Sequence, residues 1–242
     1  MGDRLLAGSY PMSAGYAEGL AFILFLICLW HAWRYEGRAF AQQWFFTGYV
    51  FALVRENLFA SFQNISYADS IIRFGSAPAA LALNFTTFSY LGYWLARGLV
   101  KSDADWRGIS WRMFIIVAAI TFPLEYVATS FGWWSYPFSD PYYLFIGHLP
   151  YFVPFAWGAS AVLFYLVLAR VRRIPFRGNG QFYALITVSP VLGVLGFPVH
   201  VLVEFLVGLT LSAGLGAIWS TLLALGWLVL PVLQLVSIPR KA

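Results

Sequence analysis

Long apolar stretches separated by short polar segments run through the whole chain. A membrane-spanning helix needs about 20 mostly apolar residues, and seven stretches approach or exceed this length. They cover residues 17–34, 43–63, 76–97, 111–132, 149–170, 181–207 and 214–236. The pattern predicts an all-α membrane protein: a seven-transmembrane helix bundle that forms one domain over residues 1–242.

The basic residues predict how these helices are oriented, because cytoplasmic loops carry an excess of Lys and Arg. One set of helix ends holds most of the basic residues of the chain: Arg34, Arg38, Arg97, Lys101, Arg107, Arg112, Arg170, Arg172, Arg173, Arg177, Arg240 and Lys241. The other set holds only Arg4 and Arg73, and Arg55 falls inside a span. We therefore expect the N-terminus outside, the C-terminus in the cytoplasm and a multi-pass location in the cell (inner) membrane.

Composition agrees with a membrane location and narrows the chemistry. The chain is 61% hydrophobic and only 10% charged, against roughly 25% charged residues in soluble domains. Aromatic residues make up 20%, an excess that favours a large apolar ligand. The single cysteine, Cys28, excludes a Cys-rich metal site, and no P-loop or dinucleotide fingerprint is present. We expect no metal, no cofactor and no nucleic-acid partner.

Two stretches of the sequence look like copies of each other. The first contains Arg55-Glu56-Asn57, Tyr67, Pro78 and Ala96-Arg97, and the second contains Leu124-Glu125-Tyr126, Tyr136, Pro150 and Ala169-Arg170. The tyrosine follows the glutamate by eleven residues in both. A weaker third echo is Phe197-Pro198-Val199-His200. The repeat predicts helix pairs that place an acid at a similar depth.

Three carboxylic acids, Glu56, Glu125 and Glu204, fall inside predicted spans. An ionisable group within a span marks a functional site facing the bundle interior, and a neutral carboxyl in an apolar pocket can donate a proton. We expect the three acids to meet in one catalytic site, with His200 on the same helix face as Glu204. Structural alternatives remain open: an ion pair at Glu56, a hydrogen bond between His200 and Glu204, or an interfacial position for Glu125.

Further residues are candidates for binding a substrate. Neighbours along a helix point in different directions, so Arg55 and Glu56 are each expected to find a partner across the bundle. The aromatic loop after the fourth span is either an interfacial belt or the floor of a pocket. The predicted substrate-binding residues are Trp133, Trp134, Tyr136, Trp157, Asn57, Asn84 and Arg55.

The segment Phe122-Pro123-Leu124-Glu125-Tyr126 resembles the Pro-x-Glu-acid motif of heterodimer-type lycopene cyclases, with Tyr126 in place of the second acid. The following stretch, through Leu149-Pro150 to Val153-Pro154-Phe155-Ala156-Trp157, is similar to the related carotenoid hydratases. The likeness covers about 50 residues. It implies that Glu125 protonates a terminal double bond of a polyene in a cavity lined by the tryptophans and Tyr136.

The leading hypothesis is thus a metal-free membrane enzyme of carotenoid or isoprenoid metabolism, a hydratase (lyase) or cyclase (isomerase). Its partners would be a hydrophobic small molecule and membrane lipids, and a homo-oligomer or a larger membrane complex stays open. One alternative is a non-catalytic pigment- or lipid-binding subunit, in which the aromatic cavity only holds the ligand. A further alternative is a small proton-coupled transporter, for which repeats and buried acids are also expected.

Overall fold

The computed structural model describes residues 12–62, 65–100, 105–136, 145–146, 148–150, 152–175 and 179–212. Most of this chain is helical. The six helices of the described residues are α1 (Met12–Tyr35), α2 (Arg38–Ser61), α3 (Ala79–Gly98), α4 (Trp106–Ser130), α5 (Val153–Val171) and α6 (Gly180–Ser212). Each overlaps one of the first six predicted spans. The seventh, residues 214–236, lies outside the described residues.

Three helical segments of the described chain are long and apolar enough to cross a membrane: Gly15–Tyr35 of α1, α4 and α5. Polar side chains explain why α2 falls short, since it carries Gln43, Arg55 and Glu56 within its length. The structure therefore shows a helical protein compatible with a membrane location. It shows fewer candidate spans than the seven that the apolar pattern predicts.

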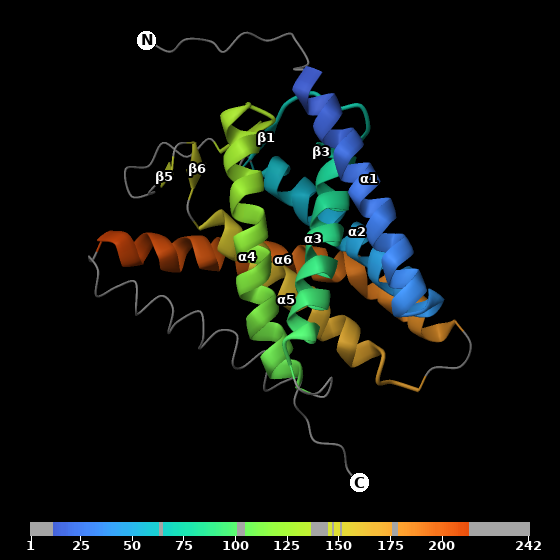
Figure 1. Ribbon diagram of the computed structural model, residues 1–242. Coiled ribbons are helices and arrows are strands. Elements are labelled where there is room, and N and C mark those ends of the chain that lie inside the picture. The colour runs from blue at the N-terminus through green and yellow to red at the C-terminus, as the bar shows by residue number, and fades with distance from the viewer. Residues whose placement is uncertain are drawn as a thin grey trace, which may run out of the picture.

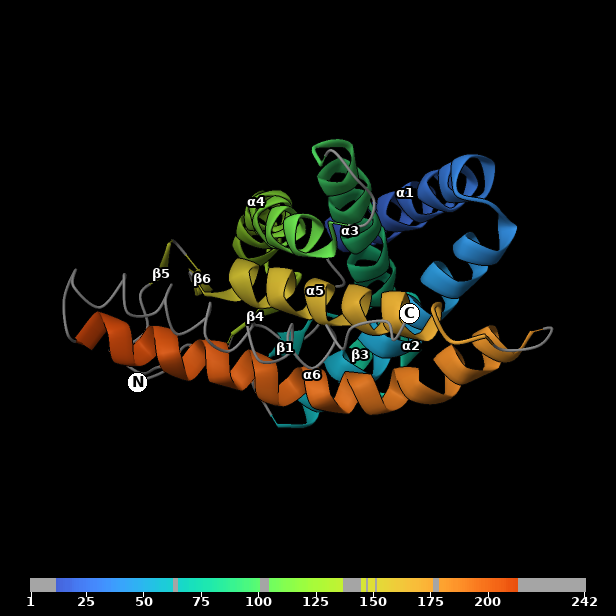
Figure 2. The ribbon, with the colours of Figure 1, turned by 90° about the horizontal axis from the view of Figure 1, so that it is seen from below.

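The helices are not all parallel to one another. Helices α3 and α4 pack side by side, whereas α6 crosses them steeply (Figure 1). Seen from below, α5 and α6 run along each other and α2 lies against α6 (Figure 2). The described helices therefore do not all run in one common direction.

Glycines allow the closest helix contacts. A Cβ at Gly158 of α5 would lie 2.6 Å from the Phe114 backbone oxygen of α4, and one at Gly193 of α6 would lie 2.8 Å from the Phe51 backbone oxygen of α2. Small residues at helix interfaces let backbones approach closely in membrane proteins. These two positions therefore fix how near α5 and α6 come to the helices that carry the acids.

Many of the aromatic residues that suggested a ligand belong to the protein core. The rings of Phe51, Phe85 and Phe164 are fully or almost fully buried, and Phe51 contacts both of the others. Trp44 is also buried and packs edge-on against Phe164 with ring centroids 5.3 Å apart. Packing between helices therefore accounts for part of the high aromatic content, while other rings such as Trp30 and Phe46 are exposed.

Within the described residues, six short strands connect the helices in two similar units. They are β1 (Ser66–Tyr67), β2 (Arg73–Phe74), β3 (Ala77–Pro78), β4 (Trp134–Ser135), β5 (Phe145–Ile146) and β6 (Leu149–Pro150). The first unit runs α2, β1, the β2–β3 hairpin and α3. The second runs α4, β4, the β5–β6 hairpin and α5. The order of elements in the predicted sequence repeat is thus the same in both copies.

The strand registers match between the two units. In each hairpin the residue that opens it pairs with a proline five residues later, Arg73 with Pro78 and Phe145 with Pro150. Strands β1 and β4 pair antiparallel with each other, and Ser66 lies opposite Ser135. Because these serines lie ten residues after Glu56 and Glu125 respectively, the two units meet at equivalent positions and bring their glutamates to the same region.

Candidate acid–base site

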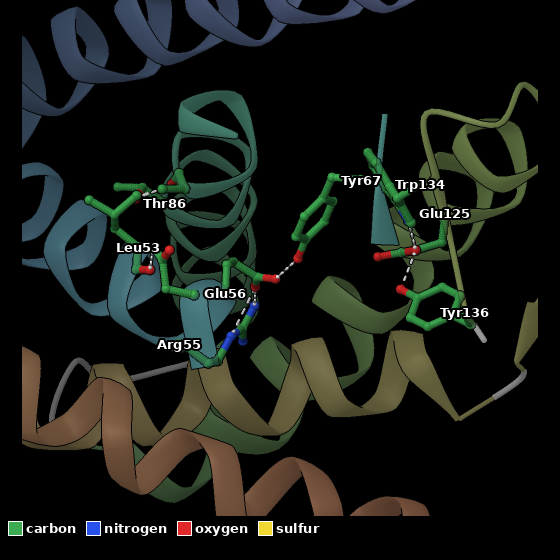
Figure 3. A network of polar contacts seen from close by, with 10 residues as sticks. Leu53, Arg55, Glu56, Tyr67, Thr86, Glu125, Trp134 and Tyr136 are labelled. Atoms are coloured by element: carbon green, nitrogen blue, oxygen red, sulfur yellow. Dashed lines mark hydrogen bonds and ion pairs between the residues drawn. The ribbon is translucent and has the colours of Figure 1, made fainter. Parts of the chain in front are cut away.

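Glu125 is buried near the end of α4, with 1% of its surface exposed. Its Oε2 atom accepts two hydrogen bonds from the strand that follows the helix, one from Trp134 Nε1 at 2.8 Å and one from the Tyr136 hydroxyl at 2.9 Å. Figure 3 shows both side chains directed at this carboxylate. Of the ion pairs between described residues, none involves Glu125. Uncharged donors therefore hold this acid.

A glycine turn places these donors. Helix α4 ends in the hydrogen-bond pattern of a Schellman motif, with Gly132 N bonded to Thr129 O at 3.2 Å and Trp133 N bonded to Ala128 O at 2.9 Å. Gly132 has a φ of 69°, a left-handed conformation that glycine adopts at little cost. The turn reverses the chain, so that β4 runs back beside the glutamate of its own helix.

Glu56 is also buried, with 5% exposure, but it has a charged partner. Its Oε1 atom accepts from Arg55 Nε at 3.1 Å and from the Arg55 Nη2 group in an ion pair. Its Oε2 atom accepts from the Tyr67 hydroxyl at 2.7 Å. The expectation that Arg55 and Glu56 find separate partners across the bundle is wrong. The long arginine side chain bends back to its neighbour, although the two Cα–Cβ bonds diverge.

Aromatic rings surround the guanidinium of Arg55, which explains that bend. Its central carbon lies 4.5 Å from the ring centroid of Phe85, 5.5 Å from that of Trp157 and 5.9 Å from that of Phe59. Arg55 is 1% exposed, so the rings and the carboxylate replace water. Cation–π contacts of a desolvated guanidinium are favourable, and together with Glu56 they make burial of the charge tolerable.

The repeat relation extends to the side chains. Tyr67 donates to Oε2 of Glu56, and Tyr136 donates to Oε2 of Glu125; each tyrosine follows its glutamate by eleven residues. Tyr67 was not among the predicted site residues. The eleven-residue spacing in the sequence was the signal that could have identified it, because Tyr136 in the second copy was included.

The two carboxylates belong to one buried region. Tyr67 lies between them, with its hydroxyl turned to Glu56 (Figure 3). Burial, followed by the negative charge of Glu56, holds the pKa of Tyr67 well above its ordinary value. Burial, the largest cause, likewise holds the pKa of Tyr136 well above its ordinary value. Both phenols therefore remain proton donors over the physiological pH range.

Three of the predicted binding residues line a surface pocket beside this region. Asn84, Trp133 and Trp134 share it with Glu18 of α1 and Pro78. Because Trp134 also donates to Glu125, one indole separates the pocket from the acid.

Trp157 of α5 contacts the guanidinium of Arg55, with 5.5 Å between the guanidinium carbon and the ring centroid. Asn57 has a structural role instead. Its side chain donates to Leu53 O at 2.8 Å and accepts from Ser76 N at 2.8 Å, which anchors the β2–β3 turn.

The remaining predicted residues are Glu204 and His200. Both belong to the C-terminal part of α6, and their side chains lie outside the described residues. The structure thus brings together Glu56 and Glu125 of the expected catalytic set, with Arg55 of the predicted substrate-binding residues beside Glu56. Within the described part of the chain, no group of three or more His, Cys, Asp or Glu residues could hold a metal ion.

Comparison with known proteins adds no relative to this picture. No family model matches the chain, and neither a curated protein nor a solved structure matches it. The resemblance to carotenoid cyclases and hydratases rests on the quoted residues alone and stays a prediction.

Proposed function

We propose that this protein is a multi-pass membrane enzyme that protonates a carbon–carbon double bond of an isoprenoid or carotenoid, with Glu125 as the general acid. The observation that carries the proposal is a fully buried carboxyl held by Trp134 and Tyr136, with no ion pair to a described residue. A buried carboxylate without a cation is costly. The neutral acid is therefore the form that such surroundings favour.

The hydrogen-bond arrangement is suited to a neutral acid. Both donors reach the same atom, Oε2 of Glu125, so the proton can sit on Oε1 without displacing either of them. The second oxygen points toward the side on which Tyr67 lies (Figure 3). An alkene that approaches from that side would meet the acidic proton, while Trp134 and Tyr136 stabilise the carboxylate left behind.

The reaction would then proceed in balanced steps. Glu125 transfers its proton to one alkene carbon, and the adjacent carbon becomes a carbocation. Aromatic faces stabilise a cation, and Trp134 and Trp157 provide them. Capture of the cation by water forms an alcohol and returns one proton to Glu125. Attack by an internal double bond instead closes a ring, and loss of a proton from a neighbouring carbon to Glu125 completes the cycle.

For the membrane arrangement we propose seven spans, with the N-terminus outside and the C-terminus in the cytoplasm of the cell membrane. The support is the uneven distribution of basic residues and the three described segments that could cross a membrane. Single-cysteine reporters in the segments 35–37 and 63–75, in a Cys28→Ala background, test this orientation. Labelling of the first segment from outside would overturn it.

The catalytic proposal is tested with Glu125→Gln, which keeps the shape and the oxygen that accepts both hydrogen bonds but removes the acidic proton. Cells that produce polyenes would express this variant, and their extracted pigments would be analysed by chromatography and mass spectrometry. General acid catalysis contributes roughly 10²–10⁴-fold, so product should fall by at least about 100-fold. The matched control is Asp105→Asn at the start of the same helix, which belongs neither to the pocket nor to the network.

Full activity of Glu125→Gln would remove the residue from the mechanism. If the native protein retains one unaltered pigment and yields no product, the protein is a binding subunit instead. Inserted protein must be quantified for each variant so that loss of folding is not read as loss of catalysis.

A further inference from the structure

The guanidinium of Arg55 has one nitrogen that no described group satisfies. Its Nε and Nη2 atoms bind Glu56, whereas Nη1 is buried without a hydrogen-bond partner among the described residues. The residue is 1% exposed, so bulk water does not reach it freely. A buried donor left unpaired costs the desolvation penalty of a charged group. Such a donor is expected to bind an acceptor in the working protein.

The surroundings restrict what that acceptor can be. The rings of Phe51, Phe59, Phe85 and Trp157 lie within 6.0 Å of the guanidinium carbon, so a molecule that reaches Nη1 must be largely apolar. Glu56 already balances the positive charge. A second anion would add an uncompensated negative charge in a buried place, which is unfavourable. A neutral oxygen is therefore the acceptor that fits.

We propose that Arg55 Nη1 binds the hydroxyl or carbonyl oxygen of an otherwise apolar isoprenoid. This deepens the proposed function and rests on it for the apolar nature of the ligand. Trp157 of α5 contacts the guanidinium, so an aromatic side chain of the predicted substrate-binding set lies beside the proposed oxygen anchor. Arg55 is in this role a binding residue that selects oxygenated substrates.

The test uses four ligands that share the farnesyl carbon chain: farnesene, farnesol, farnesal and farnesoic acid. Binding to the purified full-length protein in lipid nanodiscs is measured at equilibrium, and uptake by empty nanodiscs is subtracted. A hydrogen bond to a charged group is worth about 10-fold or more in affinity. The alcohol and the aldehyde should therefore bind at least about 10-fold more tightly than the hydrocarbon, and the ionised acid should bind less tightly than either.

The matched variant is the double substitution Arg55→Met with Glu56→Gln, which removes both charges together and leaves neither buried alone. It should bind all three neutral ligands with similar affinity. A control that removes a different ion pair, Arg97→Met with Glu36→Gln, should keep the preference for oxygen. Equal binding of farnesene and farnesal by the native protein, as expected if only water occupies Nη1, would overturn the inference. So would an unchanged preference in the Arg55 and Glu56 variant.

The same measurements separate this inference from the catalytic proposal. Glu125→Gln should keep the preference for oxygenated ligands, because it leaves Arg55 and Glu56 intact. If that preference holds while Glu125→Gln stays fully active, oxygen binding by Arg55 is correct and the acid mechanism fails. If the preference is absent while Glu125→Gln is inactive, the acid mechanism stands and oxygen binding by Arg55 fails.

Discussion

The two glutamates occupy equivalent places in two similar units, yet their surroundings differ. Glu56 and Glu125 each accept a hydrogen bond from a tyrosine eleven residues later. The residue before the glutamate is Arg55 in the first unit and Leu124 in the second. Glu56 therefore carries an ion pair, whereas indole and phenol groups hold Glu125. The residue directly before the glutamate therefore decides whether that glutamate has an ion-pair partner or remains a candidate acid.

This difference shows how two similar structural units can carry glutamates with different roles. Where two titratable groups have environments that favour different charge states, the pair can serve different roles. The first unit places a permanent charge pair near the second, and the second retains a carboxyl free of described ion pairs. Four experiments would break or sharpen this comparison, and they follow in descending order of expected effect.

The largest effect is expected from breaking the ion pair on one side. Arg55→Met leaves Glu56 buried without its cation, which costs about 3–5 kcal/mol in the free energy of unfolding. The double variant Arg55→Met with Glu56→Gln should recover most of that loss. Denaturant unfolding of the protein in detergent micelles measures both. An unchanged unfolding midpoint for Arg55→Met would show that the ion pair does not stabilise the fold.

Leu124→Arg gives the second unit the residue of the first. The introduced guanidinium should pair with Glu125, as Arg55 does with Glu56, and an opposite charge at that distance favours the ionised acid. Polyene conversion should then fall by about 100-fold, measured by pigment chromatography. Leu124→Met is the control for a change in size and should retain activity. Normal turnover in Leu124→Arg would contradict the role of this position.

Removing each tyrosine hydroxyl in turn compares the two units through a smaller loss of stability. Tyr67→Phe should cost about 1.5–3 kcal/mol, because it removes a hydrogen bond to a charged carboxylate. Tyr136→Phe should cost about 1 kcal/mol, since Trp134 still donates to the same oxygen of Glu125. Thermal unfolding measures both variants under identical conditions. A larger loss for Tyr136→Phe would indicate that Glu125 is the more strongly charged of the two acids.

The smallest effect concerns alkaline pH. The pKa values of Tyr67 and Tyr136 are raised in the folded protein by burial and nearby carboxylates, while an unfolded tyrosine ionises near pH 10. The folded state then holds more protons than the unfolded state, so stability falls as the pH rises above about 10. The double Tyr→Phe variant should show a shallower decline between about pH 9 and 11. Parallel curves would show that these phenols do not contribute.

Helix positions followed directly from the apolar pattern, because an apolar run of about 20 residues has the length of one membrane-spanning helix. The first six predicted spans correspond to α1 through α6. The number of helices that could cross a membrane was harder to predict. Helices α2 and α3 carry aromatic and polar residues at both buried and exposed positions, and the sequence pattern does not separate the two.

The candidate site could likewise be predicted only in part from the sequence. The sequence by itself identified Glu56 and Glu125 as buried acids and showed their matched spacing to Tyr67 and Tyr136. The spacing between residues in the sequence shows that the Glu–Tyr pair recurs. It does not show which partner a flexible side chain such as that of Arg55 reaches.

Only the tertiary structure decided that Arg55 turns back to Glu56. That choice depends on aromatic rings from α3 and α5, which lie far from it in the sequence. Pairing of β1 with β4 likewise joins the two units across long sequence separations. Local propensity and periodicity set the elements, whereas the charge state of each acid follows from contacts that form only when distant elements pack together.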